Sequence, residues 1–198
     1  VRMWGSLVAR NRHAGVVMQG SDLVMEATEV LDTGVELSSG RFGRGVTVQR
    51  DLEVGLTGTL TVRDCHVAQN HDSGIAVVGC SAVIERTLVE GTLAAGEAFG
   101  DGIVAAADAA DAEAPGEAAA VTVTGSAVRA NARVGVAVFG STATLSETAL
   151  TCNAFDLEKD DFGQVPPAIS VTGGVVCGCP EAGGEDCATA SIQQEPPQ

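Results

Sequence analysis

Short apolar segments separated by turn-forming residues run along most of the chain. Each is a few residues long, rich in Val and Ile, and flanked by Gly, Ser, Asn or Thr, as in Val16–Met18, Ile75–Val77 and Val136–Val138. Segments of this kind predict short β-strands between turns. Because no segment keeps an apolar stripe at helical spacing, we expect an all-β protein.

These segments belong to an internal repeat. Ser6–Gly20, Cys65–Gly79 and Ser126–Gly140 each begin with a small residue, followed by Val two positions on, Asn five on, and Gly nine and fourteen on. A small polar residue recurs at steps of 22, 37, 22, 39 and 22, at Ser6, Thr28, Cys65, Thr87, Ser126 and Thr148. Repeats of this size predict a solenoid whose units pack on their neighbours.

The repeat predicts the coil structure in some detail. We expect about six coils, in which short coils of 22 residues alternate with long coils of 37–39 residues. Val17, Ile75 and Val136 are expected to face the interior. The repeated Gly residues are expected at corners that need an unusual φ; they are Gly15, Gly20, Gly74, Gly79, Gly135 and Gly140.

The repeat also resembles a known family. The pattern N-x-x-x-G-[IV]-x-V-x-G-[SC] recurs at Asn11–Ser21, Asn70–Cys80 and Asn131–Ser141, with Met18 for the second Val in the first copy. It is similar to the repeat of the right-handed parallel β-helix proteins of the pectin-lyase-like superfamily. The resemblance covers most of residues 6 to 176 and implies that fold. It leaves function open, because the superfamily includes lyases, hydrolases, epimerases and many non-enzymes.

Six cysteines divide into two groups. Cys65 and Cys80 stand where other coils have Ser or Thr, so they are expected to be small inward-facing residues. The others gather near the end of the solenoid, and we expect them to form at least one disulfide there; they are Cys152, Cys177, Cys179 and Cys187. Disulfides indicate an oxidising compartment. A zinc site is the alternative, but the spacing is poor and no His is nearby in sequence. We therefore divide the chain into a β-helix, residues 1–176, and a C-terminal cap with a disordered tail, residues 177–198.

The amino-acid composition limits the classes of partner that the protein is expected to bind. The 198 residues carry a formal net charge of −15, with 11 Lys and Arg against 26 Asp and Glu. This charge disfavours nucleic acid and anionic membranes as partners. It also disfavours an acidic polysaccharide, unless a cation lies between the two. No stretch approaches the ~20 apolar residues of a membrane span. The chain opens at Val1 almost inside a coil, so we expect it to be part of a longer polypeptide.

Charged residues just before the repeated Gly strands are the candidates for acid–base chemistry. Residues aligned there from coil to coil are Arg12, His13, Arg44, His71, Asp72, Asp101 and Arg133. His71, Asp72 and Asp101 are expected to converge, since neighbouring coils stack about 4.8 Å apart. Such a group suits catalysis on a sugar or cation binding. Equally, these are solvated turn residues, and the Asp pairs and Gly-His-Gly motif of polygalacturonase-type sites are missing from the sequence.

Three further patterns suggest binding. Phe-Gly recurs in the long coils, so Phe42, Phe99 and Phe162 form a possible row for stacking sugar rings, or else anchor their own loops. Alternating carboxylates suggest a calcium site, although the EF-hand spacing fails; they are Asp156, Glu158, Asp160 and Asp161. Thr-rich strands such as Thr57–Thr61 raise ice binding, but we expect that no single face carries a regular Thr-x-Thr array.

These observations favour a secreted or cell-surface β-helix without catalysis of its own. We expect a structural or ligand-binding module for a glycan or a protein, with no cofactor unless calcium binds. A polysaccharide-active enzyme, a lyase, glycoside hydrolase or epimerase, is the alternative. A groove with convergent carboxylates would favour the enzyme, and a smooth wall covered by loops would favour the module.

Overall fold

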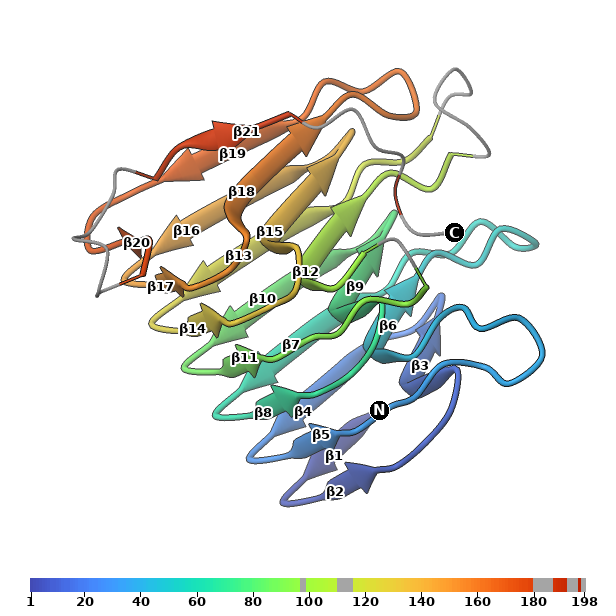
Figure 1. Ribbon diagram of the computed structural model, residues 1–198. Coiled ribbons are helices and arrows are strands. Elements are labelled where there is room, and N and C mark those ends of the chain that lie inside the picture. The colour runs from blue at the N-terminus through green and yellow to red at the C-terminus, as the bar shows by residue number, and fades with distance from the viewer. Residues whose placement is uncertain (97–98, 110–115, 180–186, 192–195, 197–198) are drawn as a thin grey trace.

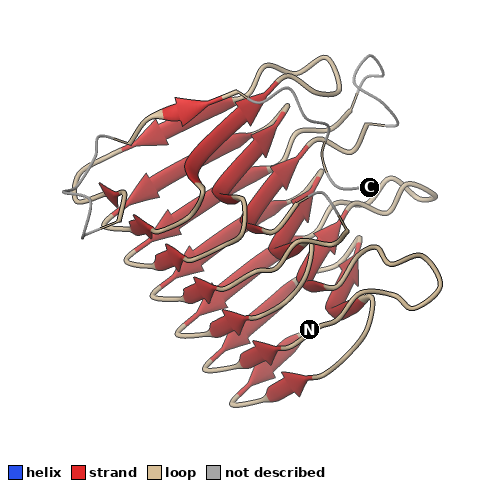
Figure 2. Cartoon of the chain, in the orientation of Figure 1, coloured by secondary structure: helices blue, strands red, loops and turns tan. Residues whose placement is uncertain are grey.

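The chain forms a parallel β-helix. The computed structural model describes residues 1–96, 99–109, 116–179, 187–191 and 196, and their regular secondary structure is all β-strand (Figure 2). The strands stack into three parallel sheets of seven strands each (Figure 1). The predicted all-β solenoid is therefore confirmed. It has about seven coils rather than six, because β1 at the start and β20 and β21 at the end lie outside the repeat.

Each coil contributes one strand to each sheet. Sheet 1 contains β1 (Arg2–Trp4), β4 (Leu23–Glu26), β7 (Thr59–Arg63), β10 (Ser81–Glu85), β13 (Ala120–Thr124), β16 (Thr142–Ser146) and β19 (Ala168–Val171). Sheet 2 contains β2 (Leu7–Ala9), β5 (Glu29–Leu31), β8 (His66–Ala68), β11 (Leu88–Glu90), β14 (Ala127–Arg129), β17 (Ala149–Thr151) and β20 (Val176–Cys177). Sheet 3 contains β3 (Ala14–Gln19), β6 (Arg44–Gln49), β9 (Ser73–Val78), β12 (Asp101–Ala106), β15 (Val134–Phe139), β18 (Phe155–Asp160) and β21 (Thr189–Ala190).

Strand pairing reproduces the predicted coil lengths. In sheet 1, Val24 pairs with Thr61, Thr61 with Val83, Val83 with Thr122, and Thr122 with Thr144, giving steps of 37, 22, 39 and 22 residues. The extra residues of the long coils lie in the connections into and out of sheet 3. Figure 1 shows the described loops around residues 34–43, 50–58 and 161–167 projecting on the same side of the stack.

The core consists of rows of apolar side chains, one from each coil, and many of them are β-branched. In sheet 3, Val46, Ile75 and Ile103 pair in register and are fully buried. Ile75 and Val136 face the interior as predicted, but the prediction for Val17 was wrong, since this side chain is 49% exposed. Val16 takes the interior position instead, because Val16 pairs with Val46 while Val17 pairs with Thr47.

The turn from sheet 2 to sheet 3 explains the Asn of the repeat. The Oδ1 of Asn70 accepts a hydrogen bond from Thr33 N at 3.0 Å, and its Nδ2 donates to Val30 O at 3.1 Å. Buried backbone groups of the preceding coil are satisfied in this way.

Glycine is required at the two Gly positions of the repeat for different reasons. The later one has positive φ, as at Gly79 with φ 57°. The earlier one, such as Gly74, does not; there a Cβ would lie 2.7 Å from Gly102 O and from Val89 Cγ1. Close packing between coils therefore requires Gly at that position, and the expected unusual φ was wrong there.

Candidate functional site

Charged residues form an ion-pair ladder along the outer side of sheet 3. Arg133 directly precedes β15, and its guanidinium makes a two-pronged contact with Asp101, at the start of β12. The Nε donates to Oδ1 at 2.8 Å, and Nη2 donates to Oδ2. The Nη1 of Arg133 lies 2.9 Å from Glu158 Oε2 of β18. One arginine therefore joins carboxylates from the coils on either side of it.

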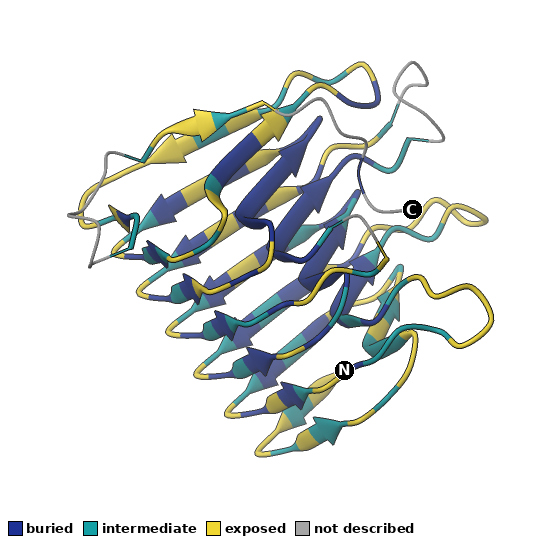
Figure 3. Ribbon diagram, viewed as in Figure 1, coloured by how far each residue is buried: buried dark blue, intermediate teal, exposed yellow. Residues whose placement is uncertain are grey.

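Burial sets the electrostatics of this ladder. The side chains of Asp101 and Glu158 are fully buried, and strands β9, β12 and β15 appear as a buried band in Figure 3. Burial raises the pKa of Asp101, although the ion pair with Arg133 opposes the rise. Burial also raises the pKa of Glu158 to about 7, against the opposing charge of Arg133. Glu158 is therefore a buried carboxyl group that exchanges its proton near neutral pH.

His71, Asp72 and Asp101 lie in neighbouring turns, but their side chains contact other residues instead of one another. The carbonyl of Asp72 accepts a hydrogen bond from Asp101 N at 3.0 Å, so the two chain segments touch. The Asp72 carboxylate lies 2.6 Å from Arg44 Nε. The Nδ1 of His71 lies 3.0 Å from Thr33 O. An acid or base that is already paired in this way has less freedom to transfer a proton to a substrate.

Two of the three candidate Phe residues occupy equivalent positions. Phe42 and Phe99 each have positive φ, 64° and 67°, and each stands two residues before a strand of sheet 3. Each ring is half-buried and carries a guanidinium over its face, at 5.4 Å for Arg44 on Phe42 and 5.3 Å for Arg133 on Phe99. The rings therefore extend the ion-pair ladder by cation–π contacts.

Phe162 differs from the other two. It follows β18 instead of preceding a strand of sheet 3, and its side chain is only 2% exposed. It packs in an apolar cluster with Val104, Ala106 and Phe139. A row of three exposed rings is therefore not formed, because the third Phe anchors its own loop.

The four carboxylates proposed for calcium do not converge on one point, although Glu158 and Asp160 are close enough to interact. Asp156 accepts hydrogen bonds from Gly178 N at 2.7 Å and Asn153 Nδ2 at 3.2 Å. Glu158 faces Arg133, Asp160 accepts a hydrogen bond from Ser191, and Asp161 is exposed. Within the described ranges, no group of three or more His, Cys, Asp or Glu residues is arranged to hold a metal ion.

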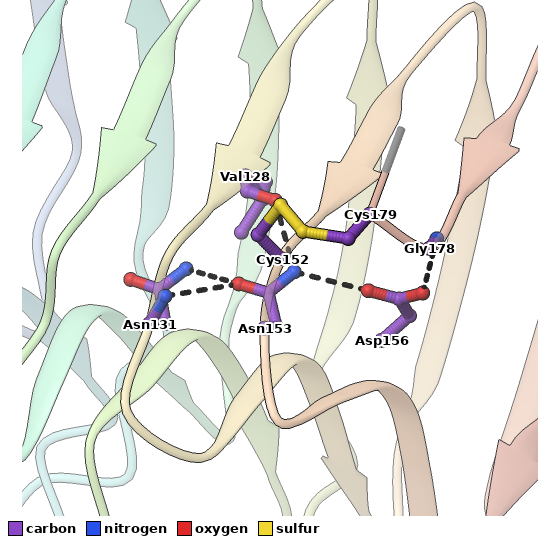
Figure 4. The surroundings of a disulfide bond; sticks show 7 residues. All are labelled: Val128, Asn131, Cys152, Asn153, Asp156, Gly178 and Cys179. Atoms are coloured by element: carbon purple, nitrogen blue, oxygen red, sulfur yellow. Dashed lines mark hydrogen bonds between the residues drawn. A yellow bond between two sulfur atoms is a disulfide. The ribbon is translucent and has the colours of Figure 1, made fainter. Parts of the chain in front are cut away.

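Two disulfides close the C-terminal end. Cys152 pairs with Cys179, and Cys177 pairs with Cys187, which confirms the predicted clip. Figure 4 shows the first bond beside Asn153 and Asp156, whose contacts hold Gly178 next to it. β20 and β21 extend sheets 2 and 3 in this part of the chain. The tail that was predicted to be disordered follows Cys187. Thr189–Ala190 of this tail form β21, and residues 192–195 and 197–198 lie outside the described residues.

Cys65 and Cys80 are buried and unpaired, as expected for small inward-facing residues. Burial raises the pKa of both thiols. A buried thiol with a raised pKa is a poor nucleophile, so these two residues serve packing.

Several hollows are formed by described residues. One of about 200 Å³ lies between loops, with Phe162 in its wall. Another, of about 670 Å³, lies at the C-terminal end, and its lining includes a single carboxylate, that of Asp156. A third, of about 400 Å³, has the carboxylates of Glu29 and Asp64 in its wall, and Asp64 accepts a hydrogen bond from Arg86 Nε at 2.8 Å. The first two hollows therefore lack a pair of carboxylates that could act together on a glycosidic bond, and in the third one of the two carboxylates is held by an arginine.

The expectation that no face carries a Thr-x-Thr array was wrong for part of sheet 1. Its outward positions from β7 to β19 carry mostly Thr, Ser and Ala, with Arg63, Val83 and Glu85 as the exceptions. The signal is the alternation Thr-x-Thr in strands such as Ala120–Thr124 and Thr142–Ser146. Recognising it requires the register between coils of unequal length, which only the structure provides.

Comparison with known proteins identifies no relative. No family model, no curated protein and no solved structure matches the chain. No helix in the described part of the chain is long and apolar enough to cross a membrane.

Proposed function

We propose that the protein is a non-catalytic, extracellular β-helix module that recognises a neutral glycan or a protein on the side of its long loops. The observation that carries this proposal is the pairing of the candidate catalytic groups. Asp72 is held by Arg44, and Asp101 and Glu158 are held by Arg133. These arginines neutralise the carboxylates that a catalytic site would need free, which suits a wall that is built for rigidity.

The extracellular location is supported by the two disulfides. Such bonds persist in oxidising environments, and they are rare in the cytosol. The residues that form them lie in the last coils, where the open end of the stack needs a clip. We also propose that the protein is secreted and that it belongs to the pectin-lyase-like superfamily. The repeat described above supports this part of the proposal.

The recognition surface is proposed for the loops that contain Phe42 and Phe99. Both rings are half-buried and keep one part accessible, and loops on a rigid scaffold are common sites of recognition. The net charge of −15 repels anionic chains and favours neutral partners. Each ring rests on a guanidinium, which fixes its orientation before a partner arrives.

Glycan-array and pull-down measurements on the whole chain test this proposal. Phe99→Ala should weaken binding while leaving the urea midpoint nearly unchanged. The matched control is Phe162→Ala, which should lower stability by about 3–5 kcal/mol because this ring is buried. If Phe99→Ala left every binding signal unchanged, the loop surface would not be the recognition site.

A polysaccharide-active enzyme of the pectin-lyase-like superfamily is the second candidate, and Glu158 is the observation in its favour. A carboxyl group with a pKa of about 7 has the proton affinity of a general acid. Incubation with neutral and acidic polysaccharides, followed by detection of new reducing ends or unsaturated products, distinguishes the two functions. Product formation that is lost in Glu158→Gln would favour the enzyme over the module.

A further inference from the structure

The outer face of sheet 1 carries an array of mostly small, uncharged residues. Alternate side chains of each strand point inward, as do Val121, Val123, Ala143 and Leu145, which are buried. The positions between them point outward. From β13 to the residue after β19 they are Ala120, Thr122, Thr124, Thr142, Thr144, Ser146, Ala168, Ser170 and Thr172. β7 and β10 extend this array with Thr59, Thr61, Ser81 and Val83, and end in Arg63 and Glu85.

The array repeats in two directions. Thr61, Val83, Thr122, Thr144 and Ser170 are direct partners across five consecutive strands, without a shift in register. Parallel strands are spaced about 4.8 Å apart, and alternate residues along a strand are about 6.6 Å apart. The coils therefore hold hydroxyl and methyl groups on a nearly rectangular grid. The unequal coil lengths do not disturb this grid, because the extra residues of the long coils lie in loops outside sheet 1.

Charge is rare on this grid. The whole chain carries 37 charged Lys, Arg, Asp and Glu side chains, 11 basic and 26 acidic, but of the fifteen outward positions from β7 to the residue after β19 only two are charged. These two, Arg63 and Glu85, pair with each other and stand in register with Thr124. The grid also lacks aromatic rings. Most of the face therefore offers no partner to an ionic ligand, whereas an uncharged, ordered surface matches it in charge.

We propose that this Thr/Ser grid binds the surface of an ice crystal. The two repeats of the grid are close to the two lattice repeats of hexagonal ice, so hydroxyl groups can take the places of lattice water molecules. The methyl groups of Thr, Val and Ala order the water between them. Because the β-helix fixes the backbone, little side-chain or chain freedom is lost on contact. The inference uses sheet 1 and does not depend on the recognition site proposed for the loops.

Alternative occupants fit this grid less well. A crystalline polysaccharide such as cellulose or chitin is usually bound by flat aromatic rings, and the grid has none. A protein partner would favour a core of apolar and aromatic residues, whereas hydroxyl groups dominate this face. Some hydroxyls are already ordered by internal bonds, as between Thr124 and Ser146 at 3.0 Å.

Ice-affinity measurements on the fluorescently labelled full chain test the proposal. The wild type should enter a slowly growing ice hemisphere and should restrain ice recrystallisation. Thr122→Tyr and Thr144→Tyr, at the centre of the grid, should abolish both effects, because each ring stands above the plane. The matched control is Thr151→Tyr on sheet 2, which should behave like the wild type. Tyr is favourable in strands, and circular dichroism verifies that all variants are folded.

Each other outcome overturns the proposal. Exclusion of the folded wild type from ice, as for a non-binding acidic protein of similar size, would show that the grid does not bind ice. Equal uptake of the wild type and both grid variants would assign ice binding to another face. Binding to crystalline cellulose or chitin without binding to ice would assign the face to a polysaccharide.

Discussion

Glu158 provides a pH-dependent prediction whose sign follows from its burial. Its pKa is raised from 4.5 to about 7 because the carboxyl group is buried, with the charges of Asp101 and Asp160 adding to the rise. The folded protein therefore binds this proton more tightly than the unfolded chain does. Ionised Glu158 destabilises the fold above about pH 7, and this penalty falls away as the pH drops from 7 towards 4.5.

The size of the effect follows from the two pKa values. The full difference between 4.5 and about 7 corresponds to roughly 3 kcal/mol, at about 1.36 kcal/mol per unit. Glu158→Gln keeps the shape of the side chain and removes the ionisable proton. The free energy of unfolding of the variant, relative to the wild type, should therefore increase by about 2–3 kcal/mol between pH 5 and pH 8.

Urea unfolding followed by circular dichroism at several pH values measures this difference. A constant offset between variant and wild type is expected from the altered contact with Arg133, so only its change with pH is diagnostic. Glu147→Gln is the matched control, because Glu147 is exposed and should give parallel curves. Parallel curves for Glu158→Gln would refute the reasoning, since they would show that Glu158 titrates alike in the folded and unfolded chains.

Further predictions concern packing, the Asn turn and the disulfides. Ile75→Ala should cost about 2–5 kcal/mol of stability and Val17→Ala less than about 0.5 kcal/mol, and equal losses in urea would mean that the coil register is wrong. Asn70→Ala leaves two buried backbone groups unpaired, so a loss of about 2–4 kcal/mol is expected by calorimetry; an unchanged midpoint would contradict this. Under limiting reductant, alkylation and mass spectrometry should find exposed Cys152 modified before buried Cys177, and the reverse order would argue against the described cap.

The fold could be predicted from the sequence where the repeat contains a residue that the packing between coils requires. The Asn and Gly of the repeat predicted the coils, since Asn70 and Gly74 perform tasks that are set by the neighbouring coil. Val17 was assigned to the interior although Val16, one residue after the repeated Gly, is the residue that corresponds to Ile75 and Val136. The pairing of Val16 with Val46 follows this alignment of the repeat.

The candidate site was harder to predict because it depends on contacts between distant segments. The Phe-Gly spacing suggested three equivalent rings, but Phe162 follows its strand of sheet 3, whereas the other two Phe residues precede theirs, and its ring is buried. The charged turn residues were found, whereas the central position of Arg133, between carboxylates of two coils, was not. Glu158 appeared to be one of several loop acids, and only its pairing in β18 shows that it is buried.

The two disulfides make the stack unequal along its axis. Both cross-link the last coils, whereas the first coil is held by hydrogen bonds and contains the exposed side chains of Trp4 and Leu7. In a solenoid each coil is supported by its immediate neighbours, so local opening can spread step by step. Unravelling should therefore start at β1 and advance as a front, and amide protection against deuterium should increase coil by coil from β1 towards the centre of the stack.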